Sequence, residues 1–224
     1  GRWDDTMVVV CADHGELHGE HDLYGHEFCL YDPLVNVPLM VKHPKLEEDR
    51  REDQVELIDL YHTVLDSVGV EGGTPASAGD DVVALDQTRS LVSGSYRQFK
   101  RANDPGQRGD GKYAFVEYSR PVVELKQLEE KAKDAGITIP EQSRYYSRMR
   151  AARRREAKYV RIDRIEDEAY RIDEDPAETT NLADADDELI QETEAMLSEF
   201  ESAIGEAWDT ADDGDVSDDA VQDM

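Results

Sequence analysis

The sequence predicts an α/β protein with a mainly parallel sheet, followed by a smaller α+β part with an antiparallel sheet. Residues 6–10 form an uninterrupted β-branched and apolar run, typical of a strand covered on both faces as in parallel sheets. Apolar residues then recur at helical spacing over residues 55–68. From about residue 110, short strand patterns alternate with helical ones, as in α+β domains.

Residues 1–95 are expected to complete the larger domain. After the strand at 6–10, residues 35–41 predict the next strand, in which Pro38 indicates an edge or a bulge. The helix over 55–68 should end at Gly69, because glycine often follows the last helical residue.

Residues 96–205 are expected to form the small α+β subdomain. Its predicted elements are a strand at 112–118, a helix at 122–135 ended by Gly136, a hairpin of strands 158–162 and 169–172, and an amphipathic helix at 189–204. The tail at 206–224 has eight acidic residues and no basic one, so we expect it to be disordered.

The charge of the chain is strongly negative. It has 53 acidic and 25 basic residues, a formal net charge of −28, and few lysines beside its arginines. Such a surface repels itself in dilute buffer and stays hydrated when salt screens it, so a salt-rich cytoplasm is the simplest interpretation. Export stays open, because a signal peptide would precede Gly1. Nucleic acid is a poor partner for this charge.

Two further features narrow the class of protein. Cys11 and Cys29 are too few for a disulfide framework and are expected to be reduced core residues. The sequence has no run of 18 apolar residues, so we expect no membrane span.

Asp13 and His14 follow the first strand directly, and Gly15 comes next. In open α/β sheets, reactive groups lie just beyond the carboxyl ends of the strands, so this pair is a candidate site. An isolated Asp before a glycine more often caps a turn. We expect Gly15 to adopt the positive φ of a tight turn.

The motifs of this chain resemble those of sulfatases of the alkaline-phosphatase-like superfamily. The first match runs from Trp3-Asp4-Asp5-Thr6 through Asp13-His14-Gly15-Glu16, Gly19-Glu20-His21-Asp22-Leu23-Tyr24-Gly25-His26 and Leu30-Tyr31-Asp32 to Val37-Pro38-Leu39-Met40-Val41. The second is Tyr170-Arg171-Ile172 followed by Asp175-Pro176-Ala177-Glu178-Thr179-Thr180-Asn181-Leu182. The resemblance implies the sulfatase sandwich fold and hydrolysis of sulfate monoesters.

The resemblance also implies roles for single residues. Asp13 and His14 would be ligands of a divalent cation, most simply Ca²⁺, with Mg²⁺, Mn²⁺ or Zn²⁺ left open by the imidazole. His26 stands where sulfatases place a Lys or His that touches the sulfate, so it would bind substrate and act in catalysis. His21 and Glu20 would support the site from behind. His18 has no assigned role.

A sulfatase nucleophile motif is missing. That motif is Cys or Ser followed by x-Pro-x-Arg, and it is oxidised to formylglycine; neither Cys11 nor Cys29 fits it. We therefore expect the chain to be the C-terminal portion of a sulfatase, inactive alone, with a sulfated small molecule or saccharide as substrate and an unknown oligomeric state. The alternatives are a phosphate or phosphonate monoester hydrolase on the same scaffold and a non-catalytic remnant.

Residues 144–164 hold nine of the 25 basic residues. They could hold a sulfated polymer, but in so acidic a chain we expect an arginine-rich helix that pairs with acidic neighbours. Tyr145, Tyr146 and Met149 would then form its buried face.

Overall fold

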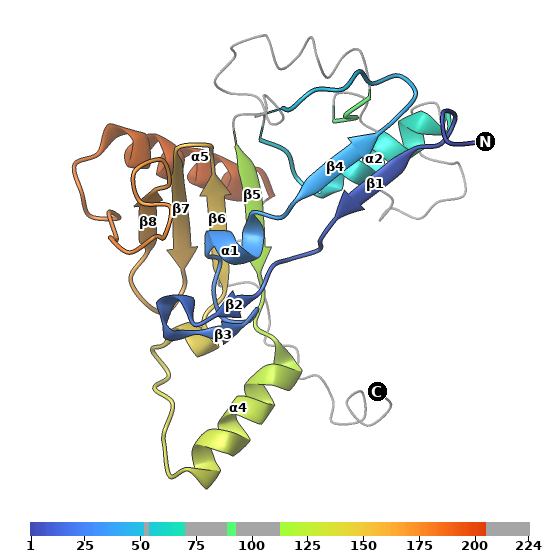
Figure 1. Cartoon of the computed structure of the whole chain (residues 1–224). Coiled ribbons are helices and arrows are strands. Elements are labelled where there is room, and N and C mark those ends of the chain that lie inside the picture. Colours follow the sequence, from blue (N-terminus) through green and yellow to red (C-terminus); the bar gives the residue numbers. More distant parts are fainter. Residues whose placement is uncertain (52–53, 70–88, 93–112, 205–224) are drawn as a thin grey trace. The chain divides into compact units, whose positions relative to one another are not determined.

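A computed structural model describes residues 1–51, 54–69, 89–92 and 113–204 (Figure 1). The chain forms two compact units, and each unit is built from two segments that are separated in the sequence. The first unit holds Gly1–Asp13 and Val37–Ala114, and the second holds His14–Asn36 and Phe115–Met224. The expected domain boundary near residue 95 and the expected disordered tail at 206–224 lie outside the described residues and stay predictions.

The first unit contains a two-stranded sheet of β1 (Val8–Cys11) and β4 (Leu39–Lys42). The two strands are antiparallel, with Val10 opposite Met40. The parallel, doubly covered strand predicted for residues 6–10 is therefore wrong, and Val10 and Met40 are 50% and 62% exposed. An apolar run of strand length does not distinguish a parallel from an antiparallel neighbour, so the sequence did not show the direction of β4.

The helix predicted over 55–68 is α2 (Ile58–Ser67), and Gly69 follows it with φ 75°. Its buried residues are polar: Asp59, His62 and Thr63. Arg89 pairs with Asp59 at 2.7 Å, and the Leu91 N–H donates to Thr63 Oγ1 at 2.9 Å. The polar side of α2 thus binds residues 89–92 through an ion pair and a hydrogen bond.

The second unit is built on the four-stranded sheet β5-β6-β7-β8. Its strands are β5 (Ala114–Tyr118), β6 (Met149–Arg153), β7 (Ala157–Ile162) and β8 (Glu168–Arg171). The pairs β6–β7 and β7–β8 are antiparallel, with Lys158 opposite Tyr170. The strand predicted at 112–118 and the hairpin predicted at 158–172 are confirmed.

Two helices belong to this unit. The predicted helix at 122–135 is α4 (Val122–Asp134), and Gly136 follows with φ 71°. The predicted helix at 189–204 is α5 (Glu188–Ile204), which packs against β6, β7 and β8 and buries Ile190 and Leu197 (Figure 1). Within the described ranges, no helix is long and apolar enough to cross a membrane.

Residues 14–36 pack onto this C-terminal sheet, although they lie far away in sequence. They form the hairpin of β2 (Leu17–His18) and β3 (Tyr24–Gly25), with the short helix η1 (Glu20–Asp22) at its turn, and then α1 (Asp32–Val35). Leu17, Cys29, Tyr31 and Leu34 form one core cluster with Tyr170, and Leu30 joins a second with residues of β6 and β7. The strand predicted over 35–41 starts only at Leu39, because Val35 ends α1.

The arginine-rich stretch is not the predicted helix. It consists of the short helix η2 (Arg144–Tyr146) and the strands β6 and β7. Met149 is buried as expected, while Tyr145 and Tyr146 are half-buried. The expected pairing with acidic residues is present, because Arg144, Arg148 and Arg161 pair with Glu168, Asp163 and Glu201.

Candidate functional site

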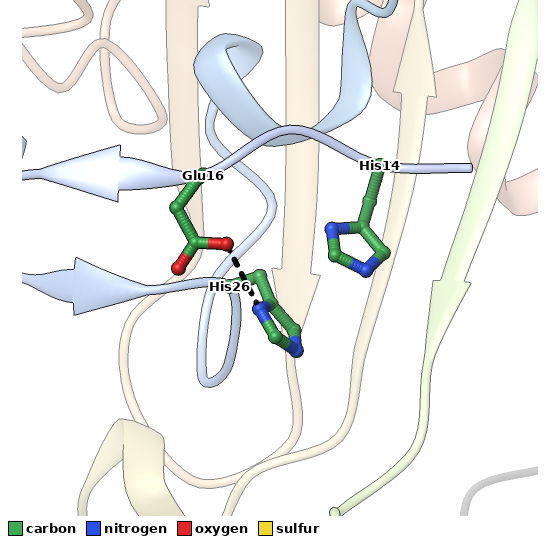
Figure 2. A group of neighbouring side chains, drawn as sticks. All are labelled: His14, Glu16 and His26. Carbon is green, nitrogen blue, oxygen red and sulfur yellow. Dashed lines mark hydrogen bonds and ion pairs between the residues drawn. The ribbon is translucent and has the colours of Figure 1, made fainter. Parts of the chain in front are cut away.

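Three side chains at the start of the second unit converge: His14, Glu16 and His26, which we call the histidine cluster (Figure 2). Leu17 pairs with Gly25 in the β2–β3 hairpin, so antiparallel register puts Glu16 opposite His26. His26 Nδ1 lies 3.2 Å from Glu16 Oε2. The hairpin thus brings together two residues ten positions apart.

His14 reaches the cluster from the segment after β1. Its ring stacks on that of His26, with centroids 4.3 Å apart and planes at 29°. Its Nδ1 lies 2.7 Å from the Gly15 carbonyl oxygen. With a proton on both Nδ1 atoms, each imidazole donates to a fixed oxygen and presents the lone pair of Nε2.

Gly15 fixes where His14 and Glu16 lie. Its N–H donates to the Leu34 carbonyl at 2.8 Å, and a Cβ at this position would lie 1.8 Å from the Pro33 carbonyl oxygen. The expected positive φ is wrong: among the described residues, the glycines with positive φ are Gly19, Gly25, Gly69 and Gly136. A glycine is needed here because two backbone segments approach closely.

The histidine cluster fits a divalent cation. One donor atom from each residue lies within 4.8 Å of the others. The side chains of Glu16 and His26 are 46% and 44% exposed, so water can complete a coordination shell. Two imidazoles and one carboxylate suit Zn²⁺ or Mn²⁺, whereas Ca²⁺ needs additional oxygen ligands.

A second carboxylate lies beside His26. His26 Nε2 lies 3.6 Å from Glu27 Oε1, and Nδ1 faces Glu16. Both ring nitrogens of His26 therefore lie near a carboxylate oxygen, and these two contacts orient the ring. Binding a cation through a ring nitrogen of His26 needs a lone pair on that nitrogen, whereas binding an anion there needs an N–H.

The other predicted site residues lie elsewhere. Asp13 is exposed, belongs to the first unit and is not in the three-residue cluster. Glu20 accepts the His18 N–H at 2.6 Å, which lowers the pKa of Glu20. His21 stacks on Tyr31 with centroids 3.6 Å apart, and burial lowers the pKa of His21. The proposed roles of Asp13, Glu20 and His21 stay predictions.

Glu16 is the residue that sequence reasoning missed. It was part of the recognised motif but had no assigned role. Only the hairpin register pairs it with His26, and that register depends on a turn in which His21 and Asp22 adopt positive φ. Asp favours turns, but its presence does not show which residues of the two strands lie opposite each other.

The two cysteines lie in different environments. Cys29 is buried as predicted, and burial raises the pKa of Cys29 to about 11. Cys11 is exposed, so the expectation that it is a core residue is wrong. The two thiols are free.

Comparison with known proteins connects this segment to a family. Residues 1–70 match the family model named Sulfatase. The uncharacterized sulfatase YidJ of Escherichia coli K12 is 27% identical over 89 residues, which are 40% of this chain and 18% of YidJ. Choline-sulfatase of Rhizobium meliloti is 24% identical over 208 residues, or 92% of this chain and 32% of that protein.

Solved structures show the same fold. BT1596, a 2-O GAG sulfatase, matches 92% of this chain with a TM-score of 0.58 and 20% identity. BT4656, solved with its substrate D-glucosamine-2-N,6-O-disulfate, gives the same TM-score and identity over 96%. Phosphonate monoester hydrolase of Agrobacterium radiobacter matches 92% with a TM-score of 0.52 and 22% identity. The chain spans only 35% to 38% of these three proteins.

Proposed function

The chain is related in sequence and fold to sulfatases of the alkaline-phosphatase-like superfamily, and on that premise we propose that it is the C-terminal portion of a metal-dependent sulfatase. The complete protein would hydrolyse sulfate monoesters. The convergence of His14, Glu16 and His26 within the sulfatase-matching residues carries this proposal.

Each residue has a role in the proposal. Asp13 and His14 hold a divalent cation, which when bound withdraws charge from the ester oxygens. His26 binds the sulfate and donates a proton from Nε2 to the leaving oxygen. Glu16 accepts from His26 Nδ1, which orients the ring.

We propose Ca²⁺ as the cation if Asp13 and Glu16 both supply oxygen ligands. The two imidazoles of the histidine cluster support Mn²⁺ as the alternative, with His26 as a ligand. The two assignments predict different results for His26→Ala: a cation held without His26 should stay bound, whereas a cation that has His26 as a ligand should be lost.

The nucleophile is proposed to come from sequence outside these 224 residues. Ser119-Arg120-Pro121-Val122-Val123 matches Cys/Ser-x-Pro-x-Arg as far as the proline but has Val123 in place of the arginine. The substrate is proposed to be a sulfated small molecule or saccharide, in keeping with the disulfated glucosamine bound by BT4656.

A phosphate or phosphonate monoester hydrolase is the second candidate. The fold shared with the Agrobacterium radiobacter enzyme favours it, because a cation and a protonated imidazole suit either anion. A non-catalytic remnant is the third possibility. Parallel assays of p-nitrophenyl sulfate, phosphate and phenylphosphonate distinguish the three.

The test compares the 224-residue chain with the same polypeptide extended upstream in its natural reading frame. We expect no sulfate ester hydrolysis by the chain and turnover by the extended protein. Turnover by the chain that disappears on mutating Cys11 or Cys29 would contradict the proposed nucleophile. Hydrolysis of only the phosphorus esters would favour the second candidate.

Three variants of the extended protein then separate the roles. Asp13→Ala should lose both metal and activity, because a charged oxygen ligand is removed. His26→Ala should keep the metal and slow turnover by about 10². His18→Ala is the matched control and should change little. Loss of metal in His26→Ala, measured by elemental analysis, would make His26 a ligand instead.

A further inference from the structure

Four charged side chains are buried together in the second unit: Asp32, Arg153, Lys158 and Glu178, which we call the buried ion cluster. Lys158 is 0% exposed and Glu178 is 1% exposed. Lysine and glutamate are almost never fully buried unless they are paired. Two positive and two negative groups balance their formal charges here.

Every member contacts another. Lys158 Nζ donates to the Leu30 carbonyl at 2.8 Å and to Asp32 Oδ1 at 3.2 Å, and it pairs with Glu178. Arg153 binds both Asp32 oxygens, at 3.1 and 2.8 Å. Glu178 Oε2 accepts the Asp32 backbone N–H at 2.6 Å.

The pKa values of the two carboxyl groups shift in opposite directions. Burial acts to raise the pKa of Asp32, but Arg153 and Lys158 outweigh it, and the pKa is lowered. Burial raises the pKa of Glu178, and the attraction of Lys158 offsets only part of that rise. Glu178 therefore depends on Lys158 more than Asp32 does, since Asp32 keeps the bidentate contact with Arg153.

The loop that carries Glu178 is built to project it inward. Asp175 Oδ2 accepts the N–H groups of Thr179 and Thr180, at 2.7 and 2.9 Å. Asn181 ties the loop to β8 by accepting the Ala169 N–H at 2.9 Å. Glu178 itself has φ 54°, which is unfavourable for a residue with a Cβ and persists only where the surroundings impose it.

The buried ion cluster is connected to the histidine cluster through α1. Asp32 is the first residue of α1, and the next two residues contact Gly15: Pro33 leaves no room for a Cβ there, and Leu34 accepts its N–H. His14 and Glu16 flank Gly15. Contacts therefore run continuously from Glu178 and Lys158 through Asp32 and α1 to the two site residues.

We propose that Glu178 and Lys158 are positioning residues that hold α1 in place and thereby fix His14 and Glu16. This gives a physical role to the downstream motif at residues 175–182. Its effect on catalysis rests on the proposed function, whereas the linkage itself can be measured in the chain without any substrate.

The test is amide hydrogen exchange, read by NMR in the 224-residue chain. The variant Lys158→Met/Glu178→Leu removes one positive and one negative charge and leaves the Arg153–Asp32 pair intact. We expect exchange at the Gly15 N–H to accelerate about ten- to a hundredfold, the factor that corresponds to losing one charged hydrogen bond. Strand amides of β6 and β7 should keep their protection.

A matched control lies on the same strand. Arg161→Met/Glu201→Leu removes another ion pair, between β7 and α5, and the acidic partners of Arg161, which are Asp167, Glu194 and Glu201, lie outside α1. It should leave exchange at Gly15 unchanged, and the imidazole resonances of His14 and His26 should shift only in the Lys158 variant.

Unchanged Gly15 exchange in the folded Lys158→Met/Glu178→Leu chain would overturn the proposal. So would equal acceleration at Gly15 in both double variants, because the effect would then be a general loss of stability. If the double variant does not fold, Glu178→Gln, which keeps an acceptor for the Asp32 N–H, is compared with Glu178→Ala. Only faster Gly15 exchange in Glu178→Ala would support the proposal, and equal rates would refute it.

Discussion

The close approach at Gly15 predicts a large cost for one added methyl group. In Gly15→Ala, the new Cβ would lie 1.8 Å from the Pro33 carbonyl oxygen and 2.9 Å from the carbonyl carbon. Real Cβ contacts do not come below 3.0 Å, so two backbone segments would have to separate by at least 1.2 Å. That movement also lengthens the 2.8 Å hydrogen bond from Gly15 to Leu34.

The magnitude follows from these two losses. Overpacking costs about 1–3 kcal/mol and a broken backbone hydrogen bond about 0.5–1.5 kcal/mol, so we expect about 2–4 kcal/mol. In a domain of this size that corresponds to a fall in Tm of about 5–15 °C. Differential scanning calorimetry of both proteins under the same salt conditions measures it.

The matched control is Gly136→Ala, which separates steric overlap from backbone strain. Gly136 has φ 71° and nothing within 4 Å of a new Cβ, so only its conformation is penalised, by about 1 kcal/mol. Gly15 does not have a positive φ, but a Cβ there would overlap the Pro33 carbonyl oxygen, so only the steric overlap is penalised. If Gly15→Ala costs no more than Gly136→Ala, residues 14–16 are not clamped against α1, and the argument for the site geometry fails.

Three further outcomes are expected. Tm should rise steeply as KCl increases from about 0.1 M to molar levels, because screening weakens repulsion within a chain of charge −28; a Tm independent of salt would remove the argument for salt adaptation. Burial raises the pKa of Tyr31 and of Tyr118 to about 12. The unfolded chain loses these protons first, so stability should be full below about pH 10 and fall between about pH 10 and 12 by about 1.4 kcal/mol per pH unit for each tyrosine. Denaturant unfolding across that pH range should show that the free energy of unfolding falls less steeply in Tyr118→Phe than in the unchanged protein. An equal slope in the two proteins would contradict burial of the Tyr118 hydroxyl. In the native chain a thiol reagent should label Cys11 quickly and Cys29 only on unfolding; rapid labelling of both would contradict the core position of Cys29.

Local patterns predicted the elements of this fold well. The helices at 122–135 and 189–204 and the hairpin of 158–162 with 169–172 depend on residues close in sequence, whose periodicity is visible there. The strand that pairs with residues 6–10, and its direction, depend on how the chain folds between the two strands. A purely apolar run does not show which way its neighbour points, and the parallel pairing was therefore wrong.

The site was predictable in its residue types and not in its grouping. His14 was found because it follows a predicted strand, and His26 was found through the resemblance to sulfatase motifs. Glu16 joins them through the register of a hairpin whose loop, residues 19–23, is longer than the two-residue turns that identify a hairpin most clearly from sequence. The arginine-rich stretch was predicted to be a helix that pairs with acidic neighbours, and only the pairing was right. Burial of Arg153 and Lys158 becomes favourable only with Asp32 and Glu178, which are distant in sequence.

The alternation of the chain between its two units bears on how the protein is made. Asp32 leaves the ribosome 146 residues before Glu178, a delay of about 7–30 s at ordinary synthesis rates. For most of that interval Leu17 and Leu34 lack Tyr170, and Leu30 lacks its partners on β6 and β7. A fragment of residues 96–205 alone would bury Lys158 without its Asp32 partner. The second unit can therefore complete its fold only late in synthesis. Its two segments, His14–Asn36 and Phe115–Met224, are separated in the chain by residues of the first unit and must pack together after both have been made.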